Sequence, residues 1–304
     1  MRLQDIAPVV SGMVVRDIEF QSLGFLESTL PRMLAYLEGE RFLELLLCNP
    51  YIVGVITTPK LAEAIPQDRS LLLSPAPKEA FYQIHNYLAT STDFYGRSFP
   101  SEISSGAFIA PTAYIAPNDV RIGPGVVVEP HVTVMERTVI EAGVILRAGC
   151  VVGAQGFEFK QSDGRLRGVA HTGGVLLHSG AEIQSNATVC RSVFGGFTEI
   201  GEDSKISNNV GIAHNVRIGK RCLIAGRVQV GGSVTIGDDV WIGPGAVIST
   251  GITIGDRAKV SIGSVVTRNV LPDQRVTGNF AVEHSRFLDF WSSTRFHQIH
   301  KTGR

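Results

Sequence analysis

The sequence has few cysteines, and those present follow no metal-binding or disulfide spacing. Cys48, Cys150, Cys190 and Cys222 are scattered over 304 residues, and no two form a C-x-x-C pair. Disulfide frameworks belong to small secreted domains, and zinc-binding cysteines come in closely spaced pairs. We therefore expect neither a disulfide-stabilised domain nor a zinc cluster, and we expect a reducing, cytoplasmic compartment.

Long apolar runs and an excess of one charge are also absent. The longest apolar stretch, residues 45–57, is interrupted by Asn49 and Pro50 and is shorter than the ~18–20 residues that span a bilayer. Lys and Arg number 28, as do Asp and Glu, so the formal net charge is zero. A nucleic-acid-binding surface needs a basic excess, and a secretory signal needs an apolar N-terminal segment. The sequence predicts no membrane span, no secretory signal and no nucleic-acid partner.

What the sequence does contain is a six-residue repeat. Every sixth residue from Ile200 to Val266 is Ile or Val, and the residue that follows each one is Gly, Ala, Ser or Thr. The same phase runs from Ile109 to Val152, with one seven-residue step, and returns from Leu177 to Val189. Neither a helix nor an ordinary strand repeats at six, whereas a stacked solenoid does. The repeat predicts about eight coils, each made of three six-residue sides.

The remaining segments lack this period and predict a three-part chain. Residues 1–104 contain apolar runs at 42–47 and 51–56, a strand at 70–73 and a helical pattern at 79–88, which together indicate a small α/β domain. The solenoid occupies residues 105–270, with an excursion loop at 154–174. The tail, residues 271–304, has apolar residues at helical spacing, and we expect this helix to pack on the array or on another subunit. They are Phe287, Leu288, Trp291, Phe296 and Ile299.

His214 is the clearest departure from the repeat. It occupies the third hexad position, whose side chain points away from the core, and one coil of eighteen residues places Gly196 below it and Gly232 above it. An imidazole between positions without side chains borders a groove that a long, thin ligand can enter. Such an imidazole suits a general base, and the Gly232 N–H suits an oxyanion donor in acyl transfer. The alternative is a surface histidine without function.

The stretch that contains His214 resembles a known catalytic coil. Residues 206–219, ISNNVGIAHNVRIG, are similar to the catalytic coil of the UDP-3-O-(3-hydroxyacyl)glucosamine N-acyltransferases of lipid A biosynthesis, and residues 151–157, VVGAQGF, resemble the opening of their loop. The resemblance implies the hexapeptide-repeat acyltransferase fold, a left-handed parallel β-helix with a small N-terminal α/β domain and a C-terminal helix. It also implies that His214 deprotonates the glucosamine 2-amino group and that Gly232 stabilises the oxyanion.

The resemblance implies partners and further site residues as well. By this resemblance we expect transfer of an acyl group from acyl carrier protein or coenzyme A to a nucleotide-linked aminosugar, in a homotrimer with active sites between subunits. We expect no permanently bound cofactor and no metal. Phe25 matches the aromatic residue that holds uracil, although the motif that follows it in the family is absent. Arg191 matches the arginine of the family's Asp-Arg-Gly-Ala-Leu-Asp-Asp run, whose acidic residues are all absent here. The candidate substrate-binding residues are Phe25, Phe157, Arg191, Asn208 and Asn215.

The C-terminal coils carry a second resemblance. Residues 238–248, DDVWIGPGAVI, and 276–281, VTGNFA, are similar to the closing coils of acetyl-CoA-dependent hexapeptide transferases. Arg257, Lys259 and Arg268 are then candidate contacts for the phosphates of coenzyme A or phosphopantetheine, unless they are ordinary solvated cations. This resemblance leaves open an acetyl-CoA-dependent N-acetyltransferase that acts on a nucleotide aminosugar in surface-polysaccharide synthesis.

Two further functions are weighed against acyl transfer. The carbonic-anhydrase branch of this fold needs three zinc-binding histidines on adjacent coils, and residues 179–283 contain only His214. An inactive solenoid that serves as an assembly scaffold is the non-enzyme alternative. His171 and His178 flank the excursion loop, where they either contact substrate or are ordinary polar loop residues.

Overall fold

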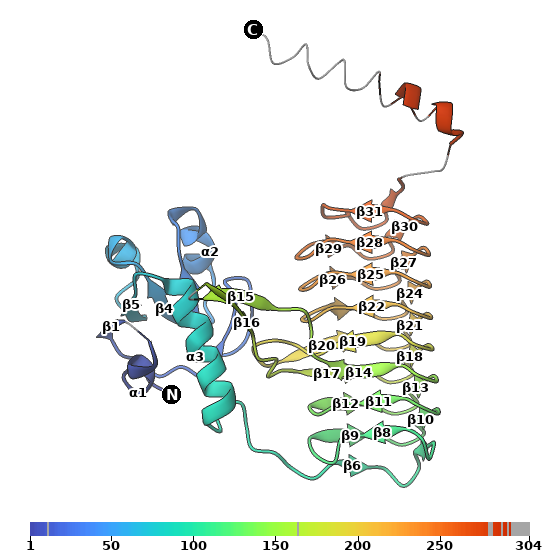
Figure 1. The fold of residues 1–304 in the computed structure, drawn as a ribbon, viewed down its shortest axis with the longest axis horizontal. Coiled ribbons are helices and arrows are strands. Elements are labelled where there is room, and N and C mark those ends of the chain that lie inside the picture. Colours follow the sequence, from blue (N-terminus) through green and yellow to red (C-terminus); the bar gives the residue numbers. More distant parts are fainter. Residues whose placement is uncertain (11, 163, 279–281, 287, 291, 293–304) are drawn as a thin grey trace.

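The computed structural model is a parallel β-helix with an α/β domain at its side (Figure 1). It describes residues 1–10, 12–162, 164–278, 282–286, 288–290 and 292. Three parallel sheets form the faces of the β-helix, with eight, nine and eight strands. Each strand pairs with its counterpart on the neighbouring coil, for example Ile212 with Val230. The predicted solenoid of about eight coils is confirmed.

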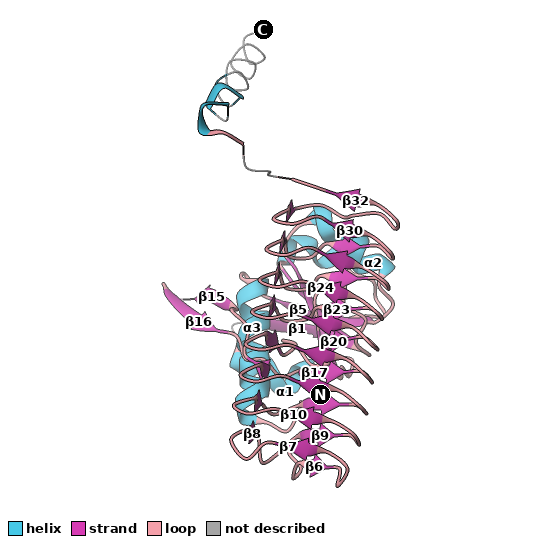
Figure 2. Ribbon diagram, turned by 90° about the vertical axis from the view of Figure 1, so that its right-hand side faces the viewer, coloured by secondary structure: helices cyan, strands magenta, loops and turns pink. Residues whose placement is uncertain are grey.

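The strands of the β-helix are short, and successive strands along the chain belong to successive faces (Figure 2). The first face contains β6 (Glu102–Ile103), β9 (Val120–Ile122), β12 (Thr138–Ile140), β17 (Gly174–Leu177), β20 (Phe197–Ile200), β23 (Arg217–Ile218), β26 (Thr235–Ile236) and β29 (Thr253–Ile254). The second contains β7 (Phe108–Ile109), β10 (Val127–Val128), β13 (Ile145–Leu146), β18 (Glu182–Ile183), β21 (Lys205–Ile206), β24 (Leu223–Ile224), β27 (Trp241–Ile242), β30 (Lys259–Val260) and β32 (Arg275–Val276). The third contains β8 (Tyr114–Ile115), β11 (Thr133–Val134), β14 (Val151–Ala154), β19 (Thr188–Cys190), β22 (Gly211–Ile212), β25 (Gln229–Val230), β28 (Val247–Ile248) and β31 (Val265–Val266).

The hexad pattern explains both the core and the corners. All twelve Ile and Val positions from Ile200 to Val266 are buried, in one continuous apolar column. The corner residue at the fourth hexad position has a positive φ, as at Asn209 (57°), Asn215 (61°) and Ser233 (58°). Asn and Gly tolerate this left-handed conformation better than other residues. One apolar column and one left-handed corner per hexad therefore bend the chain regularly around the core.

The N-terminal domain is a five-stranded sheet covered by helices, in the order β1-β5-β4-β3-β2. β1 and β5 are antiparallel, and the other pairs are parallel. The predicted strand at 70–73 and the helix around 79–88 are present as β5 and α3. The elements are α1 (Leu3–Ile6), η1 (Ala7–Val9), β1 (Met13–Arg16), β2 (Ser22–Leu23), β3 (Met33–Leu37), η2 (Glu40–Phe42), α2 (Leu43–Cys48), β4 (Ile52–Thr57), η3 (Pro59–Ala64), β5 (Ser70–Leu73) and α3 (Pro77–Ser91).

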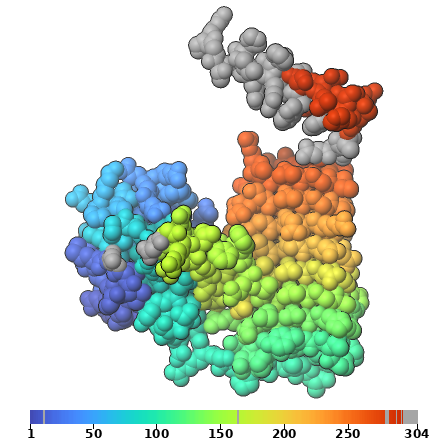
Figure 3. All heavy atoms as spheres, viewed as in Figure 1, coloured from blue at the N-terminus to red at the C-terminus, as the bar shows by residue number. Residues whose placement is uncertain are grey.

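The excursion from the β-helix contains a β-hairpin that reaches the N-terminal domain. β15 (Phe159–Ser162) and β16 (Arg165–Gly168) are antiparallel. The Asn86 side chain on α3 donates to Gly168 O at 3.0 Å and accepts from Ala170 N–H at 3.0 Å. Figure 3 shows this yellow-green segment joining the blue domain to the coils. The hairpin thus connects α3 to the coil from which it leaves.

Beyond the last coil, residues 284–286, 288–290 and 292 are helical. Leu288 and Phe290 are exposed, whereas Phe287, Trp291, Phe296 and Ile299 of the predicted apolar face lie outside the described residues, as do Asn279 to Ala281 of the closing motif. In the part of the chain that the structure describes, no helix is both long and apolar enough to cross a membrane.

Candidate active site

His214 lies at the corner between β22 and β23, on the edge of the β-helix that faces the hairpin. Its side chain is only 12% exposed. This corner column also contains Gly196 on the preceding coil and Gly232 on the next. A Cβ at Gly232 would meet the His214 ring, whereas a Cβ at Gly196 would meet Leu30 and not His214. One glycine of the corner column therefore lies against the imidazole, and the excursion covers the ring from outside.

Asn215 fixes the orientation of the imidazole. Its Oδ1 accepts a hydrogen bond from Val193 N–H at 3.0 Å and lies 3.2 Å from His214 Nδ1. Because the Val193 contact requires an acceptor, Oδ1 and not the amide nitrogen faces Nδ1. Nδ1 then carries the proton, and Nε2 presents a lone pair when the ring is neutral.

Two glycines make room for the ring. A Cβ at Gly232 would lie 2.6 Å from His214 Cε1 and 2.8 Å from Nε2. A Cβ at Gly156, on the excursion, would lie 3.0 Å from His214 Cδ2. Neither glycine has a positive φ, so what requires them is the space that the imidazole occupies and not the backbone conformation.

Glu158 approaches the exposed edge of the imidazole. Its Oε2 lies 3.5 Å from His214 Nε2, while its Oε1 pairs with Lys160. His214, when its Nε2 carries a proton, and the Lys160 ammonium lower the pKa of Glu158 to about 2, against the opposing effect of burial. The carboxylate is therefore ionised throughout the physiological range and faces the nitrogen that a general base uses.

His171 is a second imidazole at the same site. Its ring centroid lies 5.7 Å from that of His214, at an interplanar angle of 74°. Nδ1 contacts Val169 O at 3.0 Å, which requires the proton to sit on Nδ1, and the buried Nε2 has no hydrogen-bond partner among the described residues. Burial, reinforced by His214 and Arg191, lowers the pKa of His171. His171 thus presents a neutral, unpartnered acceptor.

A groove leads from this corner along the β-helix. A cavity of about 410 Å³ lies between residues 25–30 of the N-terminal domain and the outer surface of the coils, with Phe25, Gly196, Asn215 and Arg217 in its wall. The Phe25 ring packs edge-on against Phe194, with centroids 4.9 Å apart. The structure brings Phe25 and Asn215 to one groove, next to the His214 corner.

The other candidate substrate residues lie in different surroundings. Arg191 is buried beneath the start of the excursion, where Nη2 lies 3.5 Å from Glu136 and Nε has no partner in the described structure. Phe157 is 90% exposed and contacts Phe159 on the outside of the hairpin. Asn208 is exposed at a different corner, between β21 and β22. The single chain therefore does not bring Asn208 to His214.

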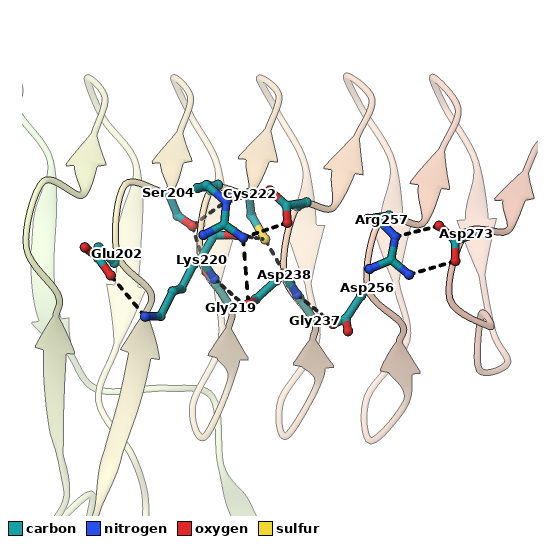
Figure 4. A network of polar contacts seen from close by, with 12 residues as sticks. Glu202, Ser204, Gly219, Lys220, Cys222, Gly237, Asp238, Asp256, Arg257 and Asp273 are labelled. Carbon is teal, nitrogen blue, oxygen red and sulfur yellow. Dashed lines mark hydrogen bonds and ion pairs between the residues drawn. The ribbon is translucent and has the colours of Figure 1, made fainter.

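The predicted thioester contacts lie on the C-terminal coils, away from the His214 corner. Arg257 makes two hydrogen bonds to Asp273, at 2.7 and 2.8 Å. Figure 4 shows this pair in a series of polar contacts between coils that includes Lys220 with Glu202 and Lys220 N–H with Asp238. Lys259 and Arg268 are exposed. Arg257 thus already has a carboxylate partner, which an incoming phosphate has to displace.

Sequence patterns do not identify Glu158 and Lys160, since both belong to the excursion, where the six-residue period stops. Nothing in the sequence of this segment indicates which coil these residues reach. In the described part of the chain no cluster of three or more His, Cys, Asp or Glu side chains is arranged to hold a metal ion. The candidate site therefore consists of the imidazoles of His214 and His171 and the carboxylate of Glu158.

Comparison with known proteins agrees with this architecture. Residues 119–154, 197–232 and 233–268 match the family of bacterial transferase hexapeptide (six repeats). These three stretches carry the hexapeptide repeat of that family. Its repeat accounts for the buried Ile/Val column, and His214 and Gly232 both lie within the matched stretches.

Individual relatives of this hexapeptide-repeat chain are acyltransferases. UDP-3-O-acylglucosamine N-acyltransferase of Rhodopirellula baltica is 41% identical over 58 residues, which are 19% of this chain and 15% of that protein. UDP-N-acetylglucosamine acyltransferase from Campylobacter jejuni is 23% identical in structural alignment, over 59% of this chain and 70% of that chain, with a TM-score of 0.50. The Francisella novicida UDP-N-acetylglucosamine acyltransferase is 22% identical over 59% of this chain and 65% of that chain, with a TM-score of 0.49. The Campylobacter structure shares the fold.

Proposed function

We propose that this protein is an N-acyltransferase that moves an acyl group from an acyl carrier protein or coenzyme A thioester to the amine of a nucleotide-linked aminosugar. The observation that carries the proposal is the His214 corner, where Asn215 fixes the Nδ1 tautomer and Gly232 lies against the ring. The name of the Rhodopirellula relative and the resemblance of residues 206–219 to the lipid A enzymes support it.

The proposed chemistry is a proton-coupled attack on a thioester. The amine nitrogen attacks the carbonyl carbon while His214 Nε2 accepts a proton from that nitrogen. The oxyanion that forms accepts a hydrogen bond from Gly232 N–H, for which no acceptor is found within the described structure. The C–S bond then breaks, the thiolate takes the proton from His214, and amide and thiol are the products.

The groove beside the corner is the proposed acceptor site. Its wall combines the Phe25 ring with the polar side chains of Asn215 and Arg217, a combination that suits a base and a sugar. We further propose that a neighbouring subunit of a homotrimer completes this groove, and that the reaction takes place in the cytoplasm. The donor thioester would approach from the C-terminal coils that carry Arg257, Lys259 and Arg268.

Product analysis tests the reaction. Mass spectrometry of products from UDP-, GDP- and dTDP-aminosugars, each offered acyl-acyl-carrier-protein or acetyl-CoA, identifies donor and acceptor together, with His214→Ala as the blank. We expect an N-acyl product from a long-chain donor. An acetylated product from acetyl-CoA alone would support the surface-polysaccharide N-acetyltransferase suggested by residues 238–248. No product from any pair would favour the inactive scaffold.

A further inference from the structure

We propose that Glu158, with His171 beside it, makes the His214 site selective for a cationic amine over a hydroxyl group. The inference rests on the proposed function, because it concerns the acceptor of that reaction. It names a specificity-determining residue outside the repeat, on the excursion that leaves the β-helix at β14. Its basis is the arrangement of hydrogen-bond acceptors around His214 Nε2.

The Glu158 carboxylate is ionised and lies beside His214 Nε2, the proposed general base. Lys160 pairs with Oε1, so the other oxygen, Oε2, is directed to His214 Nε2 at 3.5 Å. The side chains of Glu158 and His214 are only 15% and 12% exposed, so water screens their interaction less than it would at the surface. A carboxylate accepts hydrogen bonds and donates none. A ligand atom that reaches Nε2 therefore meets a negative charge.

His171 adds a second acceptor beside Gly156. A Cβ on Gly156 would lie 2.9 Å from His171 Nε2 and 3.0 Å from His214 Cδ2, so both rings border this residue. His171 is only 5% exposed, and its Nε2 lacks a partner among the described residues. An unpartnered buried acceptor is unfavourable, and a ligand that donates a hydrogen bond to it removes this cost.

An ammonium group matches this set of acceptors and a hydroxyl does not. Glu158 Oε2, His214 Nε2 and His171 Nε2 offer three acceptors, and an ammonium carries three N–H donors and a positive charge, whereas a hydroxyl carries one donor and no charge. The charged groups that face the set are Glu158 itself, Lys160 on β15 and Arg191 on the coil below. Lys160 pairs with Glu158, and Arg191 acts on His171 through its charge.

Binding of matched sugars tests recognition without acyl transfer. The full chain with ¹⁵N-labelled histidine is titrated with glucosamine or glucose at about pH 6.5, where a sugar amine is largely protonated. We expect glucosamine, and not glucose, to shift the imidazole resonances of His214 and His171. Glu158→Gln should weaken this binding by about 10- to 100-fold, the loss of a charge-assisted hydrogen bond.

Glu141→Gln is the matched control, because Glu141 also lies beside a histidine, 3.3 Å from His178 Nδ1, outside this site. Equal shifts with both sugars, no shift with either, or unchanged glucosamine binding by Glu158→Gln would overturn the inference. If glucosamine is selected but no donor is turned over, the inference stands and the proposed function fails. If N-acyl products form and Glu158→Gln keeps the full preference for the amine, the proposed function stands and the inference about Glu158 fails.

Discussion

The His214 imidazole on the preceding coil explains why residue 232 is a glycine. A Cβ there would lie 2.6 Å from His214 Cε1, closer than real Cβ contacts, and φ at Gly232 is not positive. The backbone therefore accepts alanine, and only the ring has to move. At the equivalent position in another hexad, Gly226, a Cβ would meet nothing closer than Asn208 O at 3.4 Å.

This difference gives a prediction for a single methyl group. Gly232→Ala should keep a near-native melting temperature and lower kcat/KM by about 100-fold, because displacement of a positioned base costs on the order of its catalytic contribution. Gly226→Ala is the control and should change neither quantity. Circular-dichroism melts and initial rates measure both. Unchanged activity in Gly232→Ala would show that the reaction takes place at another face of the coil.

Removal of the base itself should leave the fold intact. His214→Ala eliminates contacts with Asn215 and Glu158 only at the surface of the β-helix, while the buried column remains. We expect an oligomer that folds normally and a kcat lower by about 10²–10⁴-fold. His178→Ala, which removes a histidine beside Glu141 and Glu199, should retain full activity. A His214→Ala enzyme with more than about a tenth of wild-type kcat would exclude a general-base role.

Sequence reasoning reached some of these residues and not others, for a physical reason. His214 and Gly232 lie in a strict six-residue period, so counting eighteen residues places one above the other. Glu158 lies in the excursion, where chain position says nothing of the coil that a residue meets. His171 is a possible substrate contact from sequence, but its position beside the His214 ring is not predictable for the same reason. Asn215 was expected to bind substrate, and its observed contact with the His214 ring depends on Val193, twenty-two positions away.

At the level of elements, the hairpin β15–β16 links the site to helix α3. Asn86 holds Gly168 and Ala170 through two hydrogen bonds, and His85 Nε2 contacts Ala170 O at 2.7 Å. Glu158 and His171 lie at the two ends of this hairpin segment. The position of both acceptors near His214 therefore depends on how firmly α3 holds the hairpin.

Asn86→Ala should loosen the excursion and weaken catalysis. Loss of both hydrogen bonds should raise amide exchange across residues 154–174, and ligand binding should slow exchange there less than in wild type. Hydrogen exchange monitored by mass spectrometry measures this with and without donor and acceptor. Thr90→Ala, on the same face of α3 and bonded only to Asn86 O and Ser91, is the control. Equal protection in all states would show that the hairpin does not respond to ligands.

At the scale of the whole molecule, the six-residue period determines the β-helix but not the position of the N-terminal domain. Twelve consecutive Ile or Val positions specify a stacked core whatever the rest of the chain does, so the β-helix and its coil number follow from sequence alone. The period does not specify handedness, nor where the N-terminal domain sits. That position depends on contacts far apart in sequence, such as Phe81 against Phe194 at 5.2 Å and Asn86 against Gly168, which no local pattern encodes.

The junction between the N-terminal domain and the excursion contains a fully buried histidine. His85 Nε2 donates to Ala170 O, and Nδ1 then accepts from the Tyr95 hydroxyl, both at 2.7 Å. Burial lowers the pKa of His85 to about 4. Since the unfolded chain binds a proton at the ordinary histidine pKa, it holds more protons than the folded protein between these two values, and acid favours unfolding in that window.

The last prediction is a pH dependence of stability that originates at this junction. The free energy of unfolding should fall as the pH drops from about 6.5 towards 4, by at most about 1.4 kcal/mol per pH unit from His85, and this contribution should level off below pH 4. Buried His171, whose pKa is also lowered, adds to this loss of stability.

Urea unfolding of wild type, His85→Gln and the exposed-site control His131→Asn at about pH 7 and about pH 5 separates the contributions of these histidines. His85→Gln should be less stable at pH 7 and lose about 1–2 kcal/mol less on acidification, while His131→Asn should follow wild type. If wild type and His85→Gln lose the same free energy of unfolding on acidification, His85 does not stay buried and neutral in the folded protein.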